Sequence, residues 1–211
     1  MRIIDISMTI QKDMRVYKDL GEKRPTLIRE RVMPRDSINE SRISMNLHTG
    51  THIDSPLHML EDGWATEQLP LEKLIRPCRV LDLRNVEDGI TRDDLMPHDI
   101  KAGEFLLLKT RNSYDAGIGE SFIYLKRDGA GYLAGLGITG VGTDALGIER
   151  GQPDHATHLS LMNADILIIE GLELRDVEAG PYFMIALPIK IKDAEGAPAR
   201  VILLDSLPGI A

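Results

Sequence analysis

Side chains that could do chemistry are concentrated in one short stretch of this 211-residue sequence. Three imidazoles and one carboxylate lie within eleven positions, at His48, His52, Asp54 and His58. All four occupy even positions, so an extended backbone would direct them to the same side. Imidazole and carboxylate suit zinc, manganese, iron or nickel, and the absence of thiolate argues against a structural zinc cage. The stretch therefore predicts a metal site.

A second segment, from His155 to Glu170, contains two more histidines. Glu170 follows the apolar run Ile166–Ile169, so we expect it at the end of a buried strand, where an unpaired carboxylate is costly. His158 is expected on the preceding helix, within reach of the same strand end. His155 is interpreted as a helix-surface residue or as support for a ligand, and His98 as a surface residue.

Short strand-like runs dominate the sequence and are not regularly interleaved with helices, which predicts a mixed-sheet α/β domain rather than a doubly wound one. The expected strands are Ile3–Ser7, Thr26–Val32, Arg42–Leu47, Arg79–Leu83, Phe105–Lys109, Ile138–Gly142, Ile166–Ile169, Tyr182–Pro188 and Val201–Asp205. The expected helices are Leu71–Ile75, Ser121–Leu133 and Pro153–Met162.

One motif suggests a different protein class. Gly135, Gly137 and Gly140 match the dinucleotide-binding pattern G-x-G-x-x-G, which requires a strand before the glycines and a helix after them. Here the helical pattern comes first and the strand follows. We therefore interpret the glycines as a helix end followed by a strand start, and reject a dinucleotide site.

Composition narrows the function further. The formal net charge is −8 and no block of Lys or Arg stands out, so we expect no nucleic-acid partner. No apolar stretch approaches the ~20 residues of a membrane span, so we expect a cytoplasmic protein. The single cysteine, Cys78, is expected in the core. No repeat or linker divides residues 1–211, which predicts one domain.

The first histidine stretch resembles a family signature. The residues His48-Thr-Gly-Thr-His52-Ile-Asp54-Ser-Pro56-Leu-His58 match the H-x-G-T-H-x-D-x-P-x-H pattern of the cyclase-like metal-dependent hydrolases, which include bacterial kynurenine formamidase and isatin hydrolase. His158 and Glu170 match the order and spacing of the second metal segment of this family. The resemblance extends over nearly the whole chain.

The resemblance implies a compact α/β domain of the swivelling β/β/α type that holds one or two divalent ions, zinc or manganese. It assigns His48, His52 and Asp54 to one ion, with Asp54 bridging to a second ion that is held by His158 and Glu170. His58 would be the catalytic acid/base, and Glu170 could touch both ions and take part in catalysis. Members of the family assemble as homodimers or homotetramers.

The resemblance also implies a small-molecule amide substrate, which metal-activated water would hydrolyse. N-formylkynurenine is the leading substrate, and a cyclic amide such as isatin, or another small amide, ester or lactone, is the alternative. Kynurenine formamidases carry a Trp-Pro-Gly-Asp segment whose Trp lines the substrate site, whereas this sequence reads Val16-Tyr17-Lys18-Asp19. Tyr17 is the residue expected to present an aromatic face there.

Two other classes of protein fit part of the pattern. His52, Asp54 and His158 could form the two-histidine, one-carboxylate triad of a non-haem iron oxygenase, which leaves the other candidate ligands unused. A binding protein could keep the metal without catalysis, although it would have no need for His58.

Overall fold

The computed structural model describes residues 1–114 and 121–206. Its strands are β1 (Ile3–Asp5), β2 (Thr26–Arg31), β3 (Glu40–Ser44), β4 (His52–Asp54), β5 (Ile75–Asp82), β6 (Gly89–Ile90), β7 (Phe105–Lys109), β8 (Tyr124–Leu125), β9 (Gly140–Thr143), β10 (Leu167–Glu170), β11 (Gly180–Pro188) and β12 (Gly196–Leu204). The helices are α1 (Arg92–Leu95), α2 (Arg127–Leu136) and α3 (Ala156–Asn163), and short 3₁₀ turns cover Tyr17–Asp19, Gly21–Lys23, Pro56–His58, Thr66–Gln68, Leu71–Lys73, Met96–His98 and Arg111–Ser113.

The main sheet closes on itself. Its strand order is β1-β12-β11-β5-β7-β9-β10-β4, and β4 also pairs with β12. The strand β12 is long enough to pair with β4 at Gly196–Pro198 and with β1 at Ile202–Leu204. Strands β5, β7, β9 and β10 run parallel and the other pairings are antiparallel. The predicted mixed sheet is thus confirmed, in a barrel-like arrangement.

Closure gives the sheet an inner and an outer face, and both are buried. Along β7, Phe105 and Leu107 belong to the inner cluster, whereas Leu106 and Leu108 belong to the outer one. This alternation follows from the period of two in an extended chain. Gly140 on β9 faces inward against the Phe105 ring, where an added Cβ would lie 2.1 Å from a ring carbon. Glycine therefore lets the ring fill the barrel at this level.

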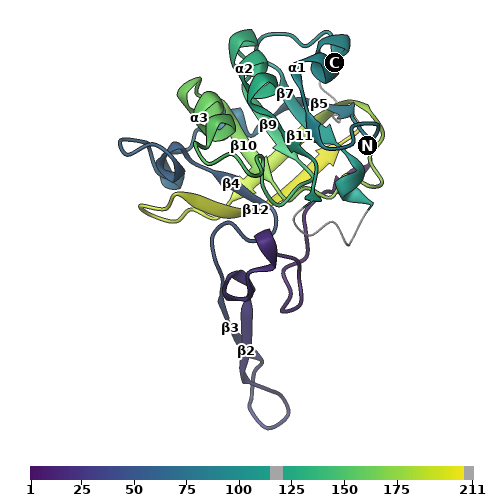
Figure 1. The fold of residues 1–211 in the computed structure, drawn as a ribbon. Coiled ribbons are helices and arrows are strands. Elements are labelled where there is room, and N and C mark those ends of the chain that lie inside the picture. The colour runs from purple at the N-terminus through teal and green to yellow at the C-terminus, as the bar shows by residue number, and fades with distance from the viewer. Residues whose placement is uncertain (115–120, 207–211) are drawn as a thin grey trace.

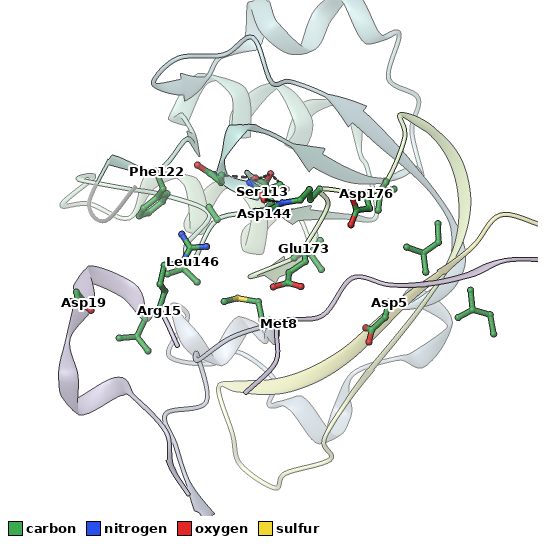
Figure 2. Close-up of a pocket in the computed structure, with 18 of the residues that line it drawn as sticks. Asp5, Met8, Arg15, Asp19, Ser113, Phe122, Asp144, Leu146, Glu173 and Asp176 are labelled. Atoms are coloured by element: carbon green, nitrogen blue, oxygen red, sulfur yellow. Dashed lines mark hydrogen bonds between the residues drawn. The ribbon is translucent and has the colours of Figure 1, made fainter. Parts of the chain in front are cut away.

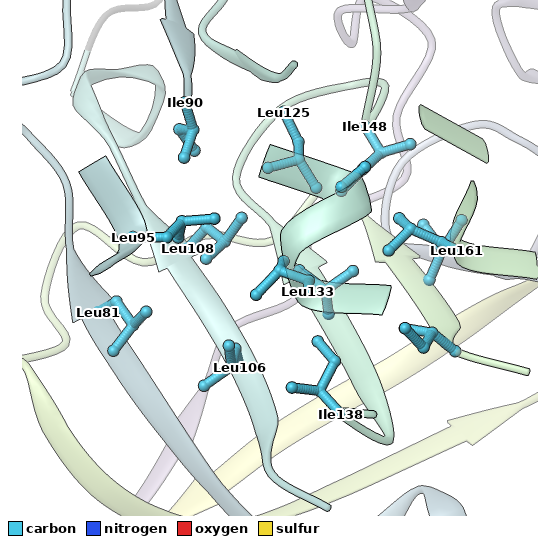
Figure 3. Close-up of a cluster of buried hydrophobic side chains, with 14 of the residues drawn as sticks. Leu81, Ile90, Leu95, Leu106, Leu108, Leu125, Leu133, Ile138, Ile148 and Leu161 are labelled. Carbon is cyan, nitrogen blue, oxygen red and sulfur yellow. The ribbon is translucent and has the colours of Figure 1, made fainter. Parts of the chain in front are cut away.

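The outer face is covered by the helices (Figure 1). Leu95 of α1, Leu133 of α2 and Leu161 of α3 pack with the outward residues of the central strands (Figure 3). Together these side chains form the outer core. The helix α2 ends at Gly137, whose φ of 68° is left-handed, and β9 begins at Gly140. This order confirms the interpretation of the glycines as a helix end followed by a strand start.

A hairpin of β2 and β3 extends away from the barrel (Figure 1). Every residue of both strands is exposed, including Leu27, Ile28 and Ile43. Among the described residues, none of the helices has the length and apolar content that crossing a membrane would require.

Three expectations about the elements need correction. Leu71–Ile75 is not a helix: Leu71–Lys73 form a 3₁₀ turn, and Ile75 begins β5. In place of one helix over Ser121–Leu133, β8 precedes α2, because Leu125 and Ile90 pair their backbones in a small parallel sheet. Similarly, α3 begins at Ala156 rather than at Pro153. In each case tertiary pairing or packing overrides the local helical pattern.

Cys78 is expected to resist thiol reagents in the folded protein. It is 5% exposed in the inner core, and burial raises the pKa of its thiol to about 12. The thiol is the unreactive form, so labelling at mildly alkaline pH should be complete only after unfolding in guanidinium. Rapid labelling of the native protein would contradict this placement.

Candidate metal centre

Two neighbouring strands present three of the predicted ligands. The strands β4 and β10 are antiparallel, and His52 pairs directly with Glu170. Ile53 and Ile169 point into the inner core, so His52, Asp54 and Glu170 point to the outer face. His52 Nε2 lies 3.4 Å from Asp54 Oδ1 and 3.4 Å from Glu170 Oε2. The strand register therefore brings together residues from the two predicted segments.

The other two histidines of the first segment come from turns on either side of β4. His48 precedes the strand, and His58 ends the 3₁₀ turn Pro56–His58. The expectation that one extended backbone aligns all four side chains is wrong, because only residues 52–54 are a strand. The rings nevertheless converge: His48 Nδ1 lies 2.9 Å from Asp54 Oδ1, and the centroids of the His48 and His58 rings are 4.1 Å apart.

The helix α3 closes the site from outside. His158 Nε2 lies 3.6 Å from Asp54 Oδ2 and 3.5 Å from Glu170 Oε1. Asp54 therefore has His48 and His52 beside one carboxylate oxygen and His158 beside the other. This is the arrangement that a carboxylate shared between two ions requires.

The buried polar atoms of this cluster fit a metal. Asp54 is 1% exposed, yet neither of its oxygens receives a hydrogen bond from a described residue, and the same holds for His52 Nε2. Buried carboxylates normally have hydrogen-bond donors. Asp144, also buried, accepts bonds from the N–H and hydroxyl groups of both Thr110 and Ser113. The unsatisfied atoms around Asp54, a mixed nitrogen and oxygen set, thus match a divalent cation.

The electrostatics lead to the same conclusion. Burial opposes charge on His52, but its contacts with Asp54 and Glu170 prevail and raise its pKa to about 10. Burial and the charge of Asp54 oppose ionisation of Glu170, yet His158 and His52 lower its pKa to about 2. Both carboxylates, Asp54 and Glu170, are thus ionised and require positive charge beside them. Protonated imidazoles, or a cation held by neutral imidazoles, can supply it.

Backbone contacts fix the orientation of the His52 ring. His52 Nδ1 lies 2.9 Å from the carbonyl oxygen of Gly50. A carbonyl only accepts hydrogen bonds, so Nδ1 carries a proton, and in the neutral ring Nε2 presents its lone pair to the cluster. An added Cβ at Gly171, which follows Glu170 with a φ of +70°, would lie 2.4 Å from the Gly50 oxygen. Glycine at this position lets the two backbones approach.

Glu149 is a functional candidate that sequence reasoning missed. It is 5% exposed, and its Oε1 lies 3.1 Å from His158 Nδ1 and 2.7 Å from His155 Nδ1. Its Oε2 accepts the N–H groups of Thr157 and His158 at the start of α3. Glu149 thus supplies the cap that His155 does not provide, and it supports His158 on the side away from the cluster. No motif or periodicity in the sequence distinguishes it from an ordinary loop glutamate.

Glu149→Gln is expected to weaken metal binding by about 10- to 100-fold, the range for a residue that orients a metal-binding histidine. The amide oxygen can still cap α3, so the circular dichroism spectrum should remain native. Competition with a chromophoric chelator measures the affinity, and Glu178→Gln, at an exposed position, is the control. If the metal affinity of Glu149→Gln equals that of the wild type, Glu149 only caps α3 and does not support the metal site.

The cluster opens into a cavity of about 650 Å³. His58 and Tyr17 both line it. Burial and the charges of Glu170 and Glu149 raise the pKa of Tyr17. Burial also lowers the pKa of His58, which leaves its ring neutral and able to accept a proton. His155 also lines the cavity and is exposed, and His98 lies elsewhere, in the turn after α1.

A second cavity of about 760 Å³ contains none of the predicted ligands (Figure 2). Asp144 lies at its wall, between Ser113 and Leu146, and Glu173 and Asp176 line another side. Burial raises the pKa of Asp144, and its hydrogen bonds to Thr110 and Ser113 join the loops that follow β7 and β9. Asp144 therefore has a structural role, since its hydrogen bonds connect these two loops.

Comparison with known proteins identifies the family. The Cyclase family model matches residues 4–150, a range that contains His48, His52, Asp54 and His58. The chain belongs to the cyclase family. The resemblance inferred from the histidine signature is therefore confirmed.

Relatives and solved structures extend this match over the rest of the chain. Kynurenine formamidase of Salinibacter ruber (strain DSM 13855 / M31) is 32% identical to this chain over 209 residues, which cover 98% of this chain and 99% of that protein. The structure of a potential metal-dependent hydrolase with cyclase activity has a TM-score of 0.91 at 47% identity, covering 98% and 99% of the two chains. Isatin hydrolase A from Labrenzia aggregata has a TM-score of 0.85 at 25% identity, covering 96% and 93%.

Proposed function

We propose that this protein hydrolyses N-formylkynurenine to kynurenine and formate. The observation that carries the proposal is the buried convergence of imidazoles and carboxylates around Asp54, with His58 beside it. The protein is a metal-dependent hydrolase that acts on an amide-type C–N bond, and its similarity to kynurenine formamidases supports the choice of substrate. We assign the activity to residues 1–211 as one domain.

The proposed ligand sets follow the contacts of Asp54. His48 and His52 would hold one ion with Asp54, and His158 and Glu170 would hold a second with its other oxygen. Zinc or manganese suits this donor set. When bound, such an ion lowers the pKa of water toward ~7 and polarises the scissile carbonyl.

The remaining steps belong to side chains of the protein. His58, neutral and within the cavity, takes the proton of the attacking water and delivers it to the leaving nitrogen. Glu170 stays ionised and holds the cluster in place from β10. Tyr17 places its ring along the cavity, where an aryl group of the substrate can pack.

The test is turnover of N-formylkynurenine by metal-reconstituted protein, with and without a chelator, read by the appearance of kynurenine. Chelator-sensitive turnover is expected. A fully metal-loaded protein that forms no kynurenine would overturn the substrate assignment. Isatin is the second candidate, supported by the likeness to isatin hydrolase A, and its ring opening would then be measured.

We further propose a cytoplasmic homodimer or homotetramer. The exposed hairpin supports assembly, because Leu27 and Ile43 pair directly across it and leave two apolar side chains next to each other in solvent. Light scattering gives the mass of the assembly, and a monomer at micromolar concentration would contradict the proposal.

A further inference from the structure

Two lysines line the cavity beside the metal centre. The ammonium groups of Lys18 and Lys23 each lie 5.4 Å from the centroid of the Tyr17 ring. Both residues, like Tyr17, belong to the wall of the 650 Å³ cavity that contains His58. Within residues 1–114 and 121–206, no carboxylate lies at ion-pair distance from either ammonium group. Both ammonium groups at the cavity wall therefore lack an anionic partner among the residues that the structure describes.

The two carboxylates that line the same cavity already have partners of their own. Glu170 lies within 3.5 Å of His52 and His158, and Glu149 binds His155, His158 and the start of α3. Neither carboxylate can therefore neutralise the lysines without leaving the metal centre. The cavity wall thus combines metal-binding groups, the Tyr17 ring and two ammonium groups that lie beside that ring.

We propose that Lys18 and Lys23 form a carboxylate subsite, so that among the aryl amides the protein hydrolyses, one with an anionic end and no ammonium group has a higher kcat/KM than N-formylkynurenine. This inference rests on the proposed amide hydrolysis. A carboxylate would accept charge-assisted hydrogen bonds from the two lysines while its aryl ring packs on Tyr17. The amide bond then lies toward His58 and the metal centre.

The absence of an ammonium group follows from like-charge repulsion. The amino-acid end of N-formylkynurenine carries an ammonium group next to its carboxylate, and that ammonium would approach two lysines that no described carboxylate pairs with. The cavity wall also contains the apolar residues Leu146, Gly147 and Pro153, and its two carboxylates, Glu149 and Glu170, lie against histidines. An anionic end is thus favoured over a zwitterionic one, and a purely cationic end is disfavoured most.

Three matched substrates test the order. N-formylkynurenine is zwitterionic, its desamino analogue is anionic, and N-formylkynuramine, which lacks the carboxylate, is cationic. With metal-loaded protein, kcat/KM is expected to be highest for the desamino acid and lowest for N-formylkynuramine. Added salt should narrow the difference by screening the lysines. Equal kcat/KM values for the three would overturn the proposal.

Methionine substitutions separate charge from packing, because the side chain keeps an apolar stem over Tyr17. Lys18→Met and Lys23→Met are each expected to lower the kcat/KM ratio of desamino acid to N-formylkynuramine by about 10-fold, the factor for one charge-assisted contact. Lys101→Met is the control, since Lys101 is exposed and pairs with Asp99 outside the cavity. A ratio that stays at the wild-type value in both variants would contradict the subsite.

Binding of the unreactive products distinguishes failure of the subsite from failure of the proposed reaction. Calorimetry would compare desaminokynurenine with kynuramine on wild type and on the Lys18→Met, Lys23→Met double variant. Tighter binding of the anion that is lost in the double variant supports the subsite even if no formamide is hydrolysed. Turnover of all three formamides at equal rates, with no preference in binding, would retain the reaction and overturn the subsite.

Discussion

His58→Ala is expected to lower kcat for N-formylkynurenine by about 10²–10⁴-fold while the protein keeps its metal. The ring lies in the cavity, 4.1 Å between centroids from His48, and burial lowers its pKa. It can therefore take a proton from the attacking water and return it to the leaving nitrogen. Alanine removes that group and leaves His48, His52 and Asp54 in position. Steady-state kinetics and elemental analysis of the same sample measure the two quantities.

The companion variant is His98→Ala. His98 lies in the 3₁₀ turn Met96–His98, away from the cavity, and its replacement should leave both kcat and metal content at wild-type values. If His58→Ala instead empties the site of metal, His58 is a ligand and the assignment of acid/base chemistry to it is wrong.

Asp54→Asn should lower metal affinity by more than about 100-fold, which exceeds the loss expected when a residue that only orients a ligand is replaced. Activity should fall in parallel with the metal content. The amide has the shape of the carboxylate, but it carries no charge and has only one acceptor oxygen. Asp54 contacts His48 through one oxygen and His158 through the other, so both proposed ion positions are affected. Titration against a competing chelator measures the loss.

Asp144→Asn is the matched control for this variant. Asp144 is also buried, but its oxygens accept hydrogen bonds from Thr110 and Ser113 and do not face imidazoles. The Asp144→Asn protein is expected to lose thermal stability and to keep its metal. The Asp54→Asn protein is expected to lose its metal before it loses thermal stability. Wild-type metal affinity in Asp54→Asn would remove Asp54 from the proposed ligands.

The sequence alone determined the chemistry of the site and most of the strands. His52 and Asp54 are two positions apart, so any strand through them shows both on one face. Glu170 ends an apolar run, so a strand formed by that run places the Glu170 carboxylate at the end of a buried element. These inferences hold because residue type and period act locally. The hydrolase family could be inferred for the same reason, since its signature lies within eleven consecutive residues.

Only the tertiary structure decided which residues meet. Pairing of β4 with both β10 and β12 closes the sheet, and this pairing places His52 beside Glu170. His48 and His58 reach the same centre from turns, and Glu149 gains its role only because α3 begins against it. Lys18 and Lys23 likewise line the cavity only because the N-terminal segment that carries them and Tyr17 packs beside residues 146–170. Such contacts join residues that are distant in sequence, and they form only when the barrel closes. A local sequence pattern does not specify that closure.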